Sequence, residues 1–255
     1  ILEKAKERGI LVDLDYLKKL SADYHIELSK LEKKIWHALG EEFNLNSPKQ
    51  LGEMLLRKLK IGLKSTQASE LEKYKEKWPV LGDILCYREY QKLLSTYIDN
   101  IPAMLDKDNR LHTTLVQTGT STGRMSSAHP NLQNIPIKPD LGRNIRRAFL
   151  ASPGHKLVSF DYSQIELRVA ALLSGDSKLI KAFKDGEDIH ETVAMEVFGV
   201  EKGKVTKEMR RQAKVLNFGI LYGMGVNALR QNLGASKEEA QQFYINYFRK
   251  FSGLA

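Results

Sequence analysis

The sequence predicts an α+β fold in which two mostly helical arms flank a small middle region that carries strands. Residues 1–105 and the residues from 162 onward place apolar side chains at helical spacing among Lys and Glu, whereas residues 106–160 are rich in Thr, Gly, Ser and Pro. With 255 residues, 42% of them hydrophobic, the chain can build a real core in one large domain or in two to three subdomains.

The N-terminal arm is predicted to be helical because its apolar residues recur every three to four positions. The clearest case is LDYLKKLSADYHIELSKLEKKIWHAL, residues 14–39. A second helix is expected after Ser47, with Ser47 as the N-cap, Pro48 in the first turn and Gln50 returning the capping contact. Ser69 is expected to cap a further helix in the same way.

A basic segment, RKLKIGLKST at residues 57–66, lies between these two helix starts. It carries Lys58, Lys60 and Lys64. Two interpretations are open: a basic hairpin tip that touches a phosphate backbone, or a solvated turn.

The middle region is expected to supply the strands. RLHTTLVQTGTSTGRMSS, residues 110–127, alternates polar and apolar residues and predicts a strand followed by a Gly/Ser loop. Residues 128–156 predict an ordered irregular connection, and KLVSFD, residues 156–161, predicts a short apolar strand. Several helices should follow from Tyr162 onward, with cap-like starts at Asp188 and Ser236.

Composition narrows the class of protein. A formal net charge of +9 favours a polyanionic partner, and a single cysteine, Cys86, excludes an intrachain disulfide and argues against a cysteine-based zinc site. No apolar run is long enough for a membrane span. The N-terminus lacks an initiator Met and is too charged for a signal peptide, so we expect a piece of a longer cytosolic protein.

One helix carries an unusual stripe. EMRRQAKVLNFGILYG, residues 208–223, spaces Arg210, Lys214, Phe218 and Tyr222 four residues apart, over roughly 18 Å of helix. Two cations followed by two aromatics suit a nucleotide, because cations meet phosphates and a ring supports the base or sugar. The alternative is an amphipathic helix with buried aromatics and exposed cations.

Asp161 ends the predicted strand at residues 156–161. A carboxylate at the end of a strand is well placed to hold Mg²⁺, and Glu166 begins a helix that can lean over the same site. The alternative is that Asp161 caps the following helix.

Together these segments resemble the polymerase domain of a family A DNA polymerase, the bacterial DNA polymerase I type. The similarity implies a right-hand architecture, with a mostly helical thumb and fingers around a small, incomplete antiparallel palm sheet. It places the thumb at 1–105, the N-terminal part of the palm at 106–176 and part of the fingers at 177–255, with a nucleotide-binding helix at about 207–222. Four matching segments follow one another in the family's order: NSPKQLGEML (46–55), TGTSTGRMSSAHPNLQNIP (118–136), DYSQIELR (161–168) and RRQAKVLNFGILYG (210–223).

The resemblance implies roles for these residues. Asp161 and the Tyr162 carbonyl would bind two Mg²⁺ ions, which activate the primer 3′-oxygen and stabilise the leaving pyrophosphate. The remaining roles concern the deoxynucleoside triphosphate. Arg210, Lys214 and His190 would hold its phosphates, and Phe218 would pack on the sugar and base, which implies discrimination against dideoxynucleotides. Tyr222 would lie by the templating base, Glu166 would reject a 2′-hydroxyl, and Gln164 would belong to the same nucleotide-binding set. Primer–template DNA would meet Arg124, Asn131, Gln133, Lys58, Lys60 and Lys64.

The family's second catalytic aspartate lies in a His-Asp-Glu motif, and the sequence ends at KFSGLA without it. We therefore expect a fragment that is inactive or very weak alone, from a protein that is monomeric when complete, makes no membrane contact and works in the bacterial cytoplasm, close to the nucleoid. Two alternatives are a non-catalytic DNA- or nucleotide-binding module and a single-subunit RNA polymerase. Glu166 argues against the RNA polymerase, because a residue that rejects a 2′-hydroxyl selects deoxynucleotides.

Overall fold

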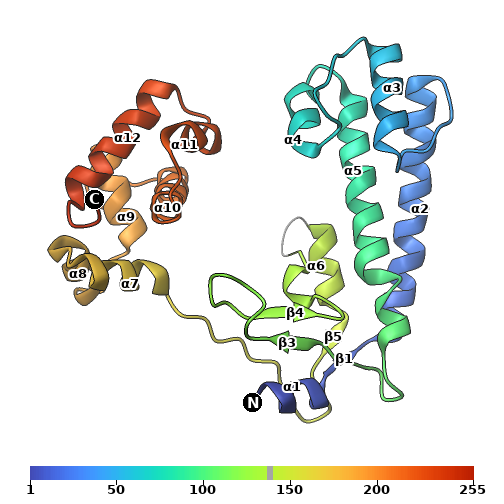
Figure 1. Ribbon diagram of the computed structural model, residues 1–255, viewed down its shortest axis with the longest axis horizontal. Coiled ribbons are helices and arrows are strands. Elements are labelled where there is room, and N and C mark those ends of the chain that lie inside the picture. Colours follow the sequence, from blue (N-terminus) through green and yellow to red (C-terminus); the bar gives the residue numbers. More distant parts are fainter. Residues whose placement is uncertain (137–139) are drawn as a thin grey trace. The chain divides into compact units, whose positions relative to one another are not determined.

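The computed structural model describes residues 1–136 and 140–255, which form two compact units, Ile1–Val158 (unit 1) and Ser159–Ala255 (unit 2) (Figure 1). The chain is mostly helical with small antiparallel sheets, so the predicted α+β class is confirmed. The division into thumb, palm and fingers stays a prediction.

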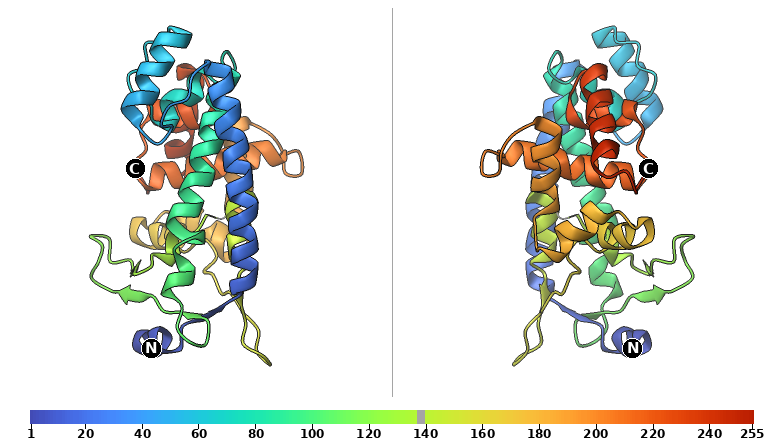
Figure 2. Two further views of the ribbon diagram at one scale, coloured as in Figure 1. Left: turned by 90° about the vertical axis from the view of Figure 1, so that its right-hand side faces the viewer. Right: turned by 90° about the vertical axis from the view of Figure 1, so that its left-hand side faces the viewer.

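Two long helices dominate unit 1. Helix α2 covers Leu14–Leu39, the segment predicted from its periodicity, and begins where the Asp13 carboxylate accepts a hydrogen bond from the Tyr16 amide at 2.9 Å. Helix α5, Pro79–Leu93, runs beside α2 and continues into a single π-helical turn, η2, at Leu94–Ile98 (Figures 1 and 2). The two helices bury one apolar cluster at each end of their contact.

The far end of this helix pair carries short helices whose caps differ in part from the prediction. Helix α3 spans Pro48–Leu59 and is capped by Ser47, as predicted. Gln50 does not return that contact, because its side-chain oxygen accepts the Asn44 amide instead, at 2.9 Å. Helix α4, Ala68–Leu71, already contains Ser69, so the predicted cap at Ser69 is wrong; the 3₁₀ turn η1, Glu72–Tyr74, follows.

The strands of unit 1 form two small antiparallel sheets. Strand β1 (Ile10–Val12), which the sequence did not predict, lies between β2 (Arg110–Leu111) and β5 (Phe149–Leu150). Strands β3 (Thr114–Val116) and β4 (Ser126–Ala128) pair where the alternation predicted a strand and a loop. The short helices around these sheets are α1 (Leu2–Arg8), η3 (Ile101–Met104), η4 (Leu132–Asn134) and α6 (Asp140–Arg146).

The connection at 128–156 is more regular than predicted. It contains η4, α6 and β5, because Ile135, Ile145 and Ala148 are buried against the cluster that α2 and η2 supply. The prediction also covered residues 137–139, which lie outside the described residues.

The predicted strand at residues 156–161 is wrong. The segment is irregular, and Leu157, Val158 and Phe160 are 60%, 67% and 93% exposed. A strand exists only when its backbone pairs with another strand, and none of the described strands pairs with this segment. An apolar run therefore predicted an extended conformation without predicting its partner.

Unit 2 is entirely helical in its regular structure, as predicted from Tyr162 onward. Its helices are α7 (Ile165–Ser174), α8 (Ser177–Lys184), α9 (Ile189–Phe198), α10 (Lys207–Leu221), α11 (Val226–Leu233) and α12 (Lys237–Lys250). Helix α9 packs against both α10 and α12 around a core that includes Leu167, Leu216, Tyr247 and Phe251. Asp188 caps α9, and Ser236 with Glu239 forms a full capping box on α12, both as predicted. In the parts of the chain that the structure describes, no helix is both long and apolar enough to cross a membrane.

Candidate functional site

Helix α10 carries the predicted stripe on its exposed side. The Thr206 hydroxyl accepts the Met209 amide at 3.1 Å to start the helix, and Gly223, at φ +75°, adopts the left-handed conformation just after its end. Arg210, Lys214 and Tyr222 are exposed, and Phe218 is half-buried. The interpretation in which both aromatics lie inside the protein is therefore wrong for Tyr222, which is 62% exposed.

Arg210 is held by the residue that caps α9. Its Nε and Nη2 lie 2.8 and 2.7 Å from Asp188 Oδ2, while Asp188 Oδ1 accepts the amides of His190 and Glu191 at 3.0 and 3.3 Å. Burial alone would raise the pKa of Asp188, but the Arg210 guanidinium and the two backbone donors outweigh it and hold the pKa below its usual range. Asp188 is thus a charged carboxylate that orients a cation on the neighbouring helix.

His190 lies in the first turn of α9 and faces α10. Its ring centroid is 5.7 Å from that of Phe218, and Lys214 Nζ is 6.0 Å from the Phe218 centroid. Burial lowers the pKa of His190; the Asp188 charge opposes this effect, whereas the charges of Arg210 and Lys214 add to it. The imidazole is therefore kept neutral at physiological pH beside two permanent cations.

Asn217 is a polar member of the site that the sequence analysis missed. Its side chain is completely buried on the inner face of α10, between Ala213 and Leu216 on one side and Gly219 on the other, and its Nδ2 lies 3.0 Å from His190 Nδ1. One signal was available: Asn217 is a polar residue on the face of the stripe helix that otherwise carries small and apolar side chains.

A second pair joins α7 to the end of α10. The Tyr222 hydroxyl donates to Glu166 Oε1 at 3.3 Å. Helix α7 starts at Ile165, with Gln164 as its N-cap residue in the left-handed conformation (φ 54°, ψ 40°). Asp161 is therefore not the cap of this helix, and that alternative is wrong.

Asp161 and Tyr162 are exposed and belong to the irregular segment before α7. Within the described residues, Asp161 makes no hydrogen bond or ion pair with the other predicted site residues. No group of three or more His, Cys, Asp or Glu side chains there could hold a metal ion. One carboxylate with a neighbouring carbonyl does not fit two divalent cations, which need several oxygen ligands each.

The predicted DNA-contacting residues of unit 1 lie in two groups. Around the β3–β4 hairpin, Arg124 is exposed and Thr120 Oγ1 donates to its carbonyl at 2.7 Å. Asn131 Oδ1 accepts the Gln133 amide at 3.1 Å, and Gln133 Nε2 donates to the Met125 carbonyl at 3.2 Å. Gln133 therefore stabilises the loop that presents Arg124, whereas Asn131 caps the 3₁₀ turn η4.

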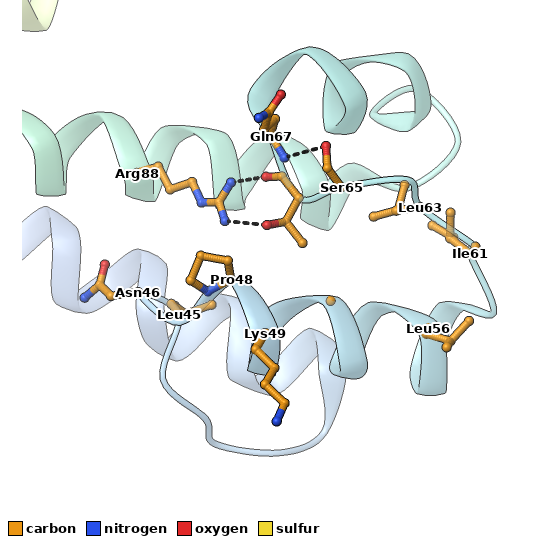
Figure 3. A pocket seen from close by; sticks show the side chains of 13 residues that line it. Leu45, Asn46, Pro48, Lys49, Leu56, Ile61, Leu63, Ser65, Gln67 and Arg88 are labelled. Carbon is orange, nitrogen blue, oxygen red and sulfur yellow. Dashed lines mark hydrogen bonds between the residues drawn. The ribbon is translucent and has the colours of Figure 1, made fainter.

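The second group surrounds the end of α3. Lys58, Lys60 and Lys64 are all exposed, and Lys60 ends α3 in the left-handed conformation (φ 54°). A pocket of about 820 Å³ opens beside them (Figure 3), but none of these three lysines lines it. Its cations are Lys49 and Arg88, and Arg88 is engaged by the carbonyl and hydroxyl oxygens of Thr66.

Comparison with known proteins gives a consistent result. The sequence profile of DNA polymerase family A matches residues 14–255. Thermostable DNA polymerase I of Thermus aquaticus is 46% identical over 261 aligned positions, which cover 98% of this chain and 31% of that protein. DNA polymerase I of Lactococcus lactis subsp. lactis is 44% identical over 262 positions, covering 100% of this chain and 30% of its own length.

A solved structure is also similar. The polymerase domain of Pol1 from M. smegmatis, in complex with DNA primer-template and dNTP, matches with a TM-score of 0.88 and 37% identity. The match covers 99% of this chain and 46% of that one. The chain thus spans less than a third of the length of these two curated relatives and less than half of this polymerase domain.

Proposed function

The chain belongs to DNA polymerase family A, a family of DNA-directed DNA polymerases, and from this premise we propose that it is part of a template-directed polymerase. In this proposal α10 binds the incoming deoxynucleoside triphosphate and unit 1 contacts primer–template DNA. The complete protein carries out DNA synthesis in the bacterial cytoplasm.

One observation carries the nucleotide assignment. Arg210, Lys214, His190 and Phe218 lie together on the packed pair α9–α10, where Asp188 and Asn217 orient two of them. Two cations and a neutral imidazole can meet the negative charge of a triphosphate, and the Phe218 ring can support the sugar and base. Transfer of a nucleotidyl group requires such positioning and charge neutralisation more than covalent help from the protein.

The other proposed roles follow from the family's motifs. Glu166, which accepts a hydrogen bond from Tyr222, limits space at the sugar 2′ position. Tyr222 lies near the templating base, and Gln164 belongs to the nucleotide-binding set. Arg124, Asn131, Gln133, Lys58, Lys60 and Lys64 contact primer–template DNA. Residues 1–105 are the thumb, 106–176 the N-terminal part of the palm and 177–255 part of the fingers.

Members of this family use Mg²⁺. Asp161 and the Tyr162 carbonyl would supply part of the ligand set of such a metal, which would act as a Lewis acid at the reacting phosphate. The described residues do not complete the coordination of two ions. Catalysis therefore requires further ligands, whereas nucleotide binding can be tested without catalysis.

A ternary-complex measurement tests the proposal without chemistry. The 255-residue chain is mixed with a primer–template whose primer ends in a dideoxynucleotide, and the affinity of each of the four fluorescent deoxynucleoside triphosphates is measured. We expect the nucleotide complementary to the template to bind most tightly, and the preference to change when the template base is changed. Equal binding of all four nucleotides would refute template direction.

Matched variants test the site itself. Arg210→Ala and Lys214→Ala should each weaken nucleotide binding about tenfold or more, as expected for the loss of a charge-assisted hydrogen bond. The controls are Arg249→Ala and Lys237→Ala, which remove the same charges from exposed positions on α12 and should change the affinity little. Primer extension in parallel separates a catalytic chain from a module that binds nucleotide and DNA without extending the primer.

A further inference from the structure

The Asn217–His190 contact is buried on both sides. Asn217 is 0% and His190 3% exposed, and the contact joins α10 to α9 at 3.0 Å between Asn217 Nδ2 and His190 Nδ1. Lys214, three residues before Asn217 on α10, and Phe218, the residue after it, both belong to the proposed nucleotide site. Asn217 itself is buried on the inner face, and its side-chain contact with a member of that site is the one to His190.

This contact determines which nitrogen of the imidazole carries the proton. An amide NH₂ group donates, so His190 Nδ1 must accept, and in the neutral ring the proton then resides on Nε2. No hydrogen bond joins Nε2 to another described residue, and Nε2 is not among the described side-chain atoms that are buried without a partner. Nε2 is therefore not completely covered on an otherwise buried ring, and in this tautomer it carries the N–H donor.

The amide orientation has an energetic reason. Among the described residues, Asn217 Oδ1 is the buried side-chain atom that lacks a hydrogen-bond partner. Turning the amide over would give this oxygen the Nδ1 contact but would leave the NH₂ group, with two donors, in the apolar interior instead. Buried N–H groups without a partner are rarer in proteins than under-satisfied carbonyl oxygens. The orientation in which Nδ2 donates is thus the more stable one.

A buried asparagine with one unpaired oxygen is a costly choice for a helix core, where leucine would fill a similar volume without a polar group. A buried polar side chain at this position is explained if its amide group has a function. We propose that Asn217 is a positioning residue for nucleotide binding: it holds the His190 ring in the tautomer with the proton on Nε2, so that this N–H donates to a phosphate oxygen of the incoming nucleotide beside Arg210 and Lys214. The inference rests on the proposed function of α10.

The protonation state supports the same arrangement. The charged and titratable groups that face His190 are Asp188 on its own helix and Arg210 and Lys214 on α10, and burial together with the two cations keeps the ring neutral. A neutral ring has only one N–H, so the tautomer determines whether Nε2 presents a phosphate oxygen with a hydrogen-bond donor or with a lone pair. Without Asn217, both tautomers would become accessible.

Nuclear magnetic resonance of the ¹⁵N-histidine-labelled chain tests the tautomer directly. The chain has 6 histidines, and His190→Gln assigns the signal. We expect the proton on Nε2 in the unsubstituted chain at neutral pH. In Asn217→Asp the carboxylate can only accept, so we expect His190 to carry a proton on Nδ1. A proton on Nδ1 alone in the unsubstituted chain would overturn the proposal.

A double-mutant cycle tests whether Asn217 acts through His190. The probe is inorganic triphosphate, which displaces a fluorescent deoxynucleotide and isolates phosphate recognition from base contacts. Asn217→Leu and His190→Gln should each weaken triphosphate binding about five- to tenfold. If Asn217 acts through the imidazole, the double variant should bind no more weakly than His190→Gln alone. Multiplicative losses, or an unchanged affinity in a folded Asn217→Leu chain, would refute the coupling.

A pH series adds a measurement that a merely structural role would not change. Triphosphate affinity of Asn217→Asp should fall as pH rises, because a doubly protonated His190 beside the new carboxylate donates from Nε2 only while it stays charged. The unsubstituted chain, measured in the same buffers, should lack this fall and should show only the change that protonation of the triphosphate itself produces. Failure of the proposed function looks different: the unsubstituted chain would then bind no triphosphate, or Lys214→Ala would have no effect.

Discussion

Asp188 offers a sharp test of how the site is built, because two kinds of contact meet on one carboxylate. Oδ1 accepts two backbone amides at the start of α9, and Oδ2 accepts Arg210. Asp188→Ala removes both contacts, whereas Asp188→Asn retains a good N-cap and removes the negative charge. The pair of variants therefore separates the cap from the ion pair.

The expected magnitudes follow from these contacts. Loss of the cap costs about 0.5–2 kcal/mol. The ion pair contributes at most about 1 kcal/mol, since the Arg210 and Asp188 side chains are 47% and 34% exposed and water screens the pair. We thus expect about 0.5–3 kcal/mol of destabilisation for Asp188→Ala and at most about 1 kcal/mol for Asp188→Asn.

Hydrogen exchange of the α9 amides measures this loss locally. Both tryptophans, Trp36 and Trp78, lie in unit 1, so their fluorescence during urea unfolding is an internal control that should not change. Because the pKa of Asp188 is depressed in the folded state, its contribution should be present above about pH 4 and disappear as pH falls through the folded-state pKa. Equal destabilisation by the two variants would refute the assignment of the cap as the larger contribution.

Three further outcomes are expected. The free energy of unfolding of unit 2, followed by far-ultraviolet circular dichroism in urea, should decrease below about pH 6.5. The reason is that His190 binds a proton more readily in the unfolded chain than when it is buried in the folded one. His190→Gln should reduce this pH dependence. Leu216→Ala should destabilise unit 2 by about 2–5 kcal/mol in the same assay, whereas Leu173→Ala, at a position 81% exposed, should cost less than about 0.5 kcal/mol. Replacing Lys58, Lys60 and Lys64 together by Ala should weaken primer–template binding. The slope of log binding constant against log salt concentration should become shallower by about 0.9 for each phosphate that the lysines neutralise. An unchanged slope would favour the solvated-turn interpretation.

Helices were the most predictable part of the fold because their signals are local. Residues 14–39 coincide with α2, and the caps at Ser47, Asp188 and Ser236 all form as predicted. A cap needs only a side-chain oxygen within three residues of the amide that it accepts. Ser69 shows the limit: the same short pattern occurs inside α4, whose first residue is Ala68.

Strands were harder to predict because each depends on a partner elsewhere in the chain. β1 is three residues long and pairs with segments about 100 and 140 positions away, so its short apolar run, Ile10-Leu11-Val12, could not identify its partners. The segment at 156–161 has strong strand composition but is not paired within the described residues. Composition thus measures the tendency to extend, while the paired state is a property of the tertiary structure.

The same distinction applies to the candidate site. Arg210, Lys214, Phe218 and Tyr222 lie on one helix, so their shared face could be predicted from spacing alone. Asp188 and Asn217 act across the α9–α10 contact, and their effects depend on two distances that no periodicity contains: 2.8 Å to Arg210 and 3.0 Å to His190. The residues that hold the cations and the imidazole in place are therefore as much a part of the site as the stripe, although only the stripe can be predicted from the sequence.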